Sequence, residues 1–168
     1  GGGFDPTLTN NGYLRVELFA ESRLVRLPHG MTLDLGAVAK GFAVDRALAE
    51  LEGLATGGLV DLGTSSIALF GSDVVTFEIR DPAGGPPPAT FRLSEGAIGS
   101  SSRGQRGDHI IDPRTGKFPS GLSAVTVVSS SALQADALST AVFSLGSDAG
   151  LALVERMGAE GMVLLVAN

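Results

Sequence analysis

The chain has 168 residues, a formal net charge of −6 and no cysteine. At this length one compact domain can bury about 70% of the surface that its unfolded chain exposes, and the acidic balance argues against a nucleic-acid surface, which requires clustered Lys and Arg. The absence of Cys excludes a disulfide framework and a thiolate metal site, and it leaves the compartment open.

The first third of the chain predicts a hairpin followed by a helix. Apolar and polar residues alternate over 13–19 and again over 24–27, with a turn at Glu21-Ser22 between the two runs, which is typical of short paired strands. From 37 to 54 apolar residues recur at helical spacing, and Gly57-Gly58 closes the segment. We expect the first helix there.

The middle of the chain predicts an antiparallel meander. Short strands are expected over 59–62, 67–70, 74–80 and 90–93, because these runs are separated by Gly, Asp and Pro. Residues 84–88 are expected to form a hairpin loop. Residues 100–107 carry Ser, Gly, Arg and Gln without periodicity, which predicts a mobile loop that covers a ligand.

The last third predicts a strand over 125–128, helices over 132–144 and 148–157, and a final strand over 162–166. Strands and helices are segregated along the chain and do not alternate strictly, which favours an α+β fold. We therefore expect an antiparallel sheet meander with helices packed on it, in a single domain over residues 1–168.

The first segment that suggests chemistry is 33–41, in which Asp34 stands at the expected end of a strand and a Gly and Ala stretch opens the expected helix. A helix N-terminus presents free N–H groups and a positive dipole end, and small residues let a phosphate approach the backbone. The alternative is a purely structural helix with Asp34 as its N-cap.

The second segment is 108–116, which gathers a His, two Asp, an Arg and a turn in nine positions. Imidazole titrates near neutral pH, so His109 is a candidate general base. The alternative is an ordinary turn over 112–116 with His109 at the start of a strand. The other histidine, His29, lies between Pro and Gly and is expected to be a turn residue.

The third segment lies on the expected helix after the long strand. Asp136 and Thr140 are four residues apart, so both project from one helical face and can reach a single ion. Hard oxygen ligands of this kind suit Mg²⁺, which takes few protein ligands and completes its shell with phosphate oxygens and water. The alternative is a helix that merely carries an exposed Asp.

In this order and spacing the three segments resemble the motif set of the ApbE-type FAD:protein FMN transferases. The resemblance rests on the Asp-x-Gly-Ala-x-Ala-Lys-Gly run of 34–41, the His-Ile-Ile-Asp-Pro-Arg-Thr-Gly run of 109–116, and the Ala-Asp-Ala-Leu-Ser-Thr run of 135–140. It extends from Phe4-Asp5-Pro6 to about Gly146. It implies a T-fold-related, ApbE-like domain that lacks the N-terminal part usual in the family.

The resemblance also implies roles for single residues. Asp34 and Lys40 would contact FAD, and Ile110 and Ser139 would line the flavin nucleotide. The backbone carbonyl of Ala37 would hold the metal together with Asp136 and Thr140, and His109 would be the catalytic base.

The implied activity is the Mg²⁺-dependent transfer of FMN from FAD to a Thr or Ser hydroxyl of a target protein, which forms a phosphoester and releases AMP. The alternatives are an FAD-binding or carrier protein and an FAD pyrophosphatase. The implied partners are FAD and an acceptor protein with a Thr-containing motif. A sheet without its opening strands would expose an edge, so a homodimer is an additional prediction. The family implies an extracytoplasmic location, periplasmic or membrane-anchored, although a cytoplasmic one stays open.

Overall fold

The computed structural model describes residues 5–8, 11–63, 65–103 and 110–166, without the side chains of 162–164 and 166. Its elements follow one another in the order η1 (Gly12–Arg15), β1 (Glu17–Phe19), β2 (Leu24–Arg26), α1 (Ala39–Glu52), β3 (Gly58–Asp61), β4 (Ser66–Phe70), β5 (Val75–Glu78), β6 (Thr90–Leu93), β7 (Gly96–Ser102), β8 (Leu122–Ser129), α2 (Ala132–Leu145), α3 (Ser147–Met157) and β9 (Gly161–Val166).

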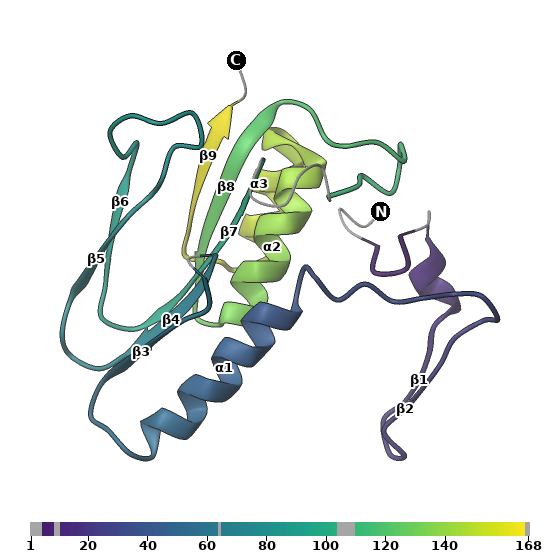
Figure 1. Ribbon diagram of the computed structural model, residues 1–168, viewed down its shortest axis with the longest axis horizontal. Coiled ribbons are helices and arrows are strands. Elements are labelled where there is room, and N and C mark those ends of the chain that lie inside the picture. Colours follow the sequence, from purple (N-terminus) through teal and green to yellow (C-terminus); the bar gives the residue numbers. More distant parts are fainter. Residues whose placement is uncertain (1–4, 9–10, 64, 104–109, 167–168) are drawn as a thin grey trace.

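The central sheet has five strands in the order β3-β4-β7-β8-β9, and every neighbouring pair is antiparallel. Helix α1 packs against β3 and β4, and α2 packs against β7 and β8, with α3 behind α2. The helices therefore cover one face of the sheet (Figure 1). The predicted α+β class and the antiparallel meander are confirmed, with one change. Strands β5 and β6 leave the meander and form a separate hairpin, because β4 pairs directly with β7.

Three local predictions were wrong. The stretch 13–19 is extended only from Glu17, since Gly12–Arg15 forms a 3₁₀ turn after Asn11 in a left-handed conformation with φ of 59°. No strand ends at Asp34, because residues 27–35 run without regular structure after β2 ends at Arg26. Residues 100–102 belong to β7, where β8 pairs with them. The remainder of the predicted loop, 104–107, lies outside the described residues.

Helix α2 forms the centre of the fold because both of its flanks are covered. Its apolar residues Leu138, Val142 and Phe143 pack with β8 and α3 in the larger of two buried clusters. Burying one such side chain fully stabilises the fold by roughly 1.5–3 kcal/mol. A second cluster, formed by Val44, Ala68, Ala97 and Ala132, joins α1 to the sheet and to the start of α2.

Two glycines allow the backbones around α2 to approach closely. A Cβ at Gly41 would overlap the backbone of Ala132, and a Cβ at Gly99 would overlap the backbone of Ala135. Real side-chain atoms do not reach such distances, so both positions require glycine. Helix α1 and strand β7 therefore both pack closely against the backbone of α2. The candidate site described below lies where these three elements meet.

The β1–β2 hairpin projects away from the body of the molecule (Figure 1), and all six of its residues are exposed. The Arg26 guanidinium donates to Glu17 at 2.9 Å and also lies over the Phe19 ring, which holds the two strands together. The predicted hairpin is confirmed. Among the described residues, no helix is long and apolar enough to cross a bilayer.

Candidate functional site

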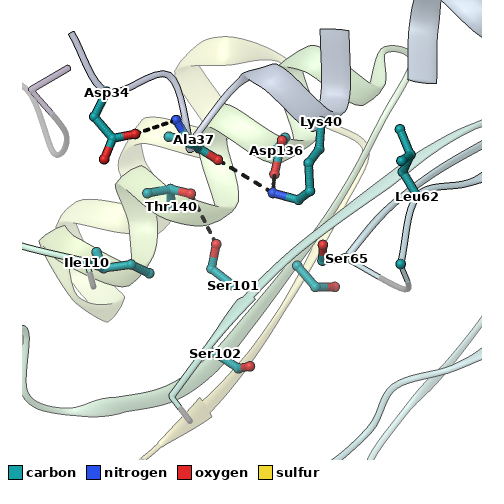
Figure 2. Close-up of a pocket in the computed structure, with 13 residues that line it drawn as sticks. Asp34, Ala37, Lys40, Leu62, Ser65, Ser101, Ser102, Ile110, Asp136 and Thr140 are labelled. Atoms are coloured by element: carbon teal, nitrogen blue, oxygen red, sulfur yellow. Dashed lines mark hydrogen bonds and ion pairs between the residues drawn. The ribbon is translucent and has the colours of Figure 1, made fainter. Parts of the chain in front are cut away.

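A cavity of about 460 Å³ opens where the segment before α1, the β3–β4 turn, β7 and α2 converge (Figure 2). This volume falls in the range of small-molecule sites. The residues that line it are Asp34, Gly36, Ala37, Lys40, Leu62, Gly63, Ser65, Ser100, Ser101, Ser102, Ile110, Asp136 and Thr140.

Asp136 is the buried charge of this cavity, with 1% of its surface exposed. Its Oδ2 accepts a hydrogen bond from the backbone N–H of Gly41 at 2.9 Å, and its Oδ1 lies 3.4 Å from the Lys40 ammonium. A carboxylate taken out of water needs such partners, because an uncompensated buried charge is strongly destabilising. The alternative of a helix with an exposed Asp is therefore wrong.

The two helices hold each other through reciprocal bonds. Asp45 of α1 accepts hydrogen bonds from the backbone N–H groups of Ala132 and Leu133 at 2.7 and 3.0 Å, and from the Ser131 hydroxyl at 2.8 Å. These N–H groups have no partner within their own helix, so Asp45 caps α2 from outside and matches its positive end. In the same way Asp136 of α2 accepts a hydrogen bond from the Gly41 N–H in the first turn of α1. These two aspartates hold the helices together, which places Lys40 opposite Asp136.

The start of α1 faces the cavity through Gly36, Ala37 and Lys40. The N-cap position is Val38, and no side chain caps the helix there. The alternative with Asp34 as N-cap is thus wrong: Asp34 Oδ1 accepts from the Gly36 N–H at 2.7 Å and shapes the turn that precedes the helix. The N–H groups of Val38 and Ala39 donate to the Leu35 carbonyl, and that of Gly41 donates to Asp136. The positive end of the helix dipole beside a lysine is a favourable environment for a phosphate.

Hydroxyl groups form the wall of the cavity between β7 and α2. Ser101 Oγ lies 2.9 Å from Ser139 Oγ and 3.2 Å from Thr140 Oγ1. The serines at 65 and 100–102, which line the cavity, were missed as site residues. The Gly-Ser-Ser-Ser run at 99–102 is the signal that could have found them, since small polar residues in a strand packed on a helix leave room beside it.

The turn at 112–117 fastens the far end of α2. Asp112 is 5% exposed and accepts two hydrogen bonds from the Arg114 guanidinium, each at 2.9 Å, while the same guanidinium donates to the Ser144 carbonyl at 3.1 Å. The guanidinium of Arg114 holds the pKa of Asp112 below its ordinary value, although burial acts to raise it. The expected turn over 112–116 is confirmed, with Gly116 at φ of 68°. His29 also lies in a turn, as expected.

The structure brings together most of the residues named from the sequence. Asp34, Ala37, Lys40, Ile110, Asp136 and Thr140 all line the cavity. Ser139 is fully buried, and its hydroxyl bonds Ser101 and the Asp136 carbonyl, so it lies behind the wall. His109 lies outside the described residues.

The oxygen atoms of the cavity suit a hard divalent cation. The Lys40 ammonium lies 3.4 Å from Asp136 Oδ1 and 3.5 Å from the Gly36 carbonyl, which shows that this corner attracts positive charge. The described residues contain no group of three or more His, Cys, Asp or Glu that could hold a metal. The Asp136 carboxylate, the Thr140 hydroxyl and the Ala37 carbonyl, whose residues line the cavity, are ligands of the kind that fits Mg²⁺, because this ion also keeps several waters or phosphate oxygens.

The sequence matches the model of the ApbE family over residues 4–163. The chain is 39% identical over 152 residues to the FAD:protein FMN transferase of Treponema pallidum, a match that covers 76% of this chain and 41% of that protein. It is 30% identical over 141 residues to the FAD:protein FMN transferase of Haemophilus influenzae, covering 74% and 40% of the two chains. The chain thus spans about two fifths of the length of these relatives.

Two solved structures share the fold. The ApbE protein of Thermotoga maritima superposes with a TM-score of 0.81 at 30% identity, covering 95% of this chain and 57% of that one. The flavinyl transferase ApbE of Pseudomonas stutzeri, in its apo form, superposes with a TM-score of 0.73 at 25% identity and covers 92% and 53% of the two chains. These likenesses agree with the α+β sheet and the helices described above.

Proposed function

The chain belongs to the ApbE family, and from this premise we propose that it transfers FMN from FAD to a Thr or Ser hydroxyl of a target protein and releases AMP. The observation that supports this proposal most is the corner formed by Lys40, Asp136 and the start of α1. It combines a lysine ammonium, the positive end of a helix and oxygen ligands beside one cavity. A pyrophosphate with a bound cation has the complementary chemistry.

FAD binding is assigned to the residues at the cavity mouth. Lys40 would face the pyrophosphate with its ammonium, and the start of α1 would face it with the positive end of the helix dipole. Ile110, which lines the cavity and is 4% exposed, would contact the flavin nucleotide, and Asp34 would also contact FAD. Ser139 would act from behind the wall by orienting Ser101.

The metal is assigned to Asp136, Thr140 and the backbone carbonyl of Ala37, all of which line the cavity. When bound, Mg²⁺ supplies neutralisation of the negative charge on the phosphate oxygens. Asp136 is already held by the Gly41 N–H, so its carboxylate is oriented before any ligand arrives. Lys40 would then turn from Asp136 to the phosphates.

The transfer forms one bond and breaks one. The acceptor hydroxyl oxygen bonds to the phosphorus of the FMN half, the bond from this phosphorus to the bridging oxygen breaks, and AMP leaves with that oxygen. The hydroxyl proton goes to a base, for which His109 is proposed. The role of the described residues is to align the acceptor and the leaving group and to keep water out.

Replacing Lys40 with Met tests the FAD site directly. The variant keeps the aliphatic stem and removes the ammonium, so we expect FAD affinity, measured by flavin fluorescence, to fall by about 10-fold to 100-fold. Lys117→Met is the matched control, because Lys117 is exposed in the 112–117 turn. Equal FAD affinity for both variants, with native far-UV circular dichroism, would remove Lys40 from the site.

A further inference from the structure

One side of β7 loses its neighbouring strand at the cavity. On one flank β8 pairs with β7 as far as Ser102, and the Arg103 N–H still donates to the Ser123 carbonyl. On the other flank β4 pairs with residues 96–99, and the last bond runs from the Ser100 N–H to the Ser65 carbonyl at 2.8 Å. Beyond Ser65 the chain turns back into β3, because the Leu62 N–H donates to the Ser66 carbonyl.

The alternation of an antiparallel ladder fixes where the groups of Ser102 point. Residues 101 and 103 direct their backbone groups to β8, so residues 100 and 102 direct theirs to the flank of β4. Ser100 finds Ser65 there. On that flank no described residue forms a backbone hydrogen bond with Ser102. We name the N–H and C=O of Ser102 on this flank the β7 edge.

The β7 edge lies between two cavities that share the end of β7 in their lining. The first is the candidate site, and the second, of about 500 Å³, lies between the sheet and the β5–β6 hairpin. Both include Ser100, Ser101 and Ser102 in their lining. Ser101 turns toward α2 and bonds Thr140, as Figure 2 shows, whereas Ser100 turns to the opposite face and bonds Thr126 at 3.0 Å.

We propose that the β7 edge docks the acceptor protein as an added strand, in which an extended segment pairs with Ser102 and directs its Thr or Ser side chain into the candidate site. This inference rests on the proposed transferase function and names how its protein substrate binds. An exposed strand edge recruits an extended segment through main-chain hydrogen bonds, and pockets on the two faces receive alternate side chains.

The pairing predicts which acceptor residue forms hydrogen bonds with Ser102 and which one carries the hydroxyl that is modified. A residue directly opposite Ser102 exchanges two backbone hydrogen bonds with it and turns its side chain to the second cavity, because opposite residues share a face. Its neighbour in the segment, opposite Ser101, turns toward Asp136 and Thr140. The acceptor hydroxyl belongs to this neighbour. The backbone N–H of the modified residue points away from β7.

Backbone methylation of the acceptor tests this geometry. The native chain is incubated with FAD, Mg²⁺ and four pools of nine-residue peptides with a central Thr and randomised flanks. One pool is unmodified, and the others carry an N-methyl group on the Thr, on the residue before it, or on the residue after it. We expect methylation of one neighbour to lower the yield of flavin-labelled peptide about tenfold or more, and methylation of Thr to lower it far less.

A change in the enzyme provides the second arm. Ser102→Pro removes the free N–H, and an edge position whose N–H faces outward tolerates Pro. Ser102→Ala removes only the hydroxyl, so it corrects for any effect on FAD that the two variants share. We expect the yield of labelled peptide at saturating FAD to be about tenfold lower for Ser102→Pro than for Ser102→Ala.

The outcomes separate this inference from the function on which it rests. Equal labelling of all four pools, or equal yields from the two Ser102 variants, would overturn the docking edge and leave the transferase intact. Intact FAD with every pool, or AMP without labelled peptide, would overturn the proposed transfer and the docking edge together.

Discussion

The Asp136 carboxylate is almost inaccessible to water and lies between the backbone N–H of Gly41 in α1 and the Lys40 ammonium. Spacing alone predicted that Asp136 and Thr140 share a helical face, because i and i+4 are neighbours on any helix. The burial and the contact with Lys40 could not be predicted, since Lys40 is 96 residues away in sequence. Only the packing of α1 on α2 brings them together.

Asp136→Asn is expected to lower Mg²⁺-dependent release of AMP from FAD by at least about 100-fold, because the amide keeps the shape and loses the charge that we propose to bind the cation. AMP is measured by chromatography at saturating FAD. Asp148→Asn is the control, since Asp148 is an exposed residue in the first turn of α3. Undiminished release by the Asp136 variant would exclude this carboxylate from the metal site.

Asp112 predicts a pH dependence of stability. The pKa of its carboxyl is lowered in the folded state by Arg114, relative to an ordinary value of about 3.9 in the unfolded chain. The unfolded state therefore binds the proton more tightly, so the stabilisation is complete above the unfolded pKa and is lost as the pH falls through the folded pKa.

Asp112→Asn is therefore expected to lower the free energy of unfolding at neutral pH by about 1–2 kcal/mol, a value reduced because the Arg114 side chain is partly exposed. The difference from the native chain should shrink as the pH falls from about 5 to below the lowered pKa. Denaturant titrations at several pH values measure it. A difference that stays constant over this range would show that the ion pair is not its cause.

At the scale of elements, the sequence predicted the three described α-helices and every described strand except β7, because their apolar runs are bounded by Gly, Asp or Pro. The errors fell where tertiary pairing decides the outcome. Residues 100–102 have no strand periodicity, and they are extended because β8 pairs with them. The expected loop at 84–88 does connect β5 and β6, but nothing local indicated that this hairpin lies outside the central sheet.

The junction of α1 and α2 is expected to depend on Asp45. Asp45→Ala removes three hydrogen bonds to the start of α2 and should lower stability by about 1–2 kcal/mol, as the loss of a helix cap does. For a chain of this size the Tm would fall by about 2–8 °C. Calorimetry measures the shift. Glu50→Ala, an exposed change on the same helix, is the control, and equal Tm values for the two variants would contradict the capping role.

At the scale of the whole molecule, α1, α2 and β7 each contribute residues to one cavity. The chain nevertheless spans about two fifths of the relatives that carry the transferase name, with 41% and 40% of their lengths covered. The resemblance in sequence pointed to the family because three motifs recur in order. It could not place the motifs in space, and His109 lies outside the described residues.

The most direct test of the proposed function is incubation of the chain with FAD, a Thr-containing peptide pool and either Mg²⁺ or a chelator, followed by chromatography and mass spectrometry. We expect AMP together with peptides that carry the added mass of FMN in phosphoester linkage, and we expect both products to disappear with the chelator. Intact FAD with unmodified peptides in the presence of Mg²⁺ would contradict the proposed transfer of FMN.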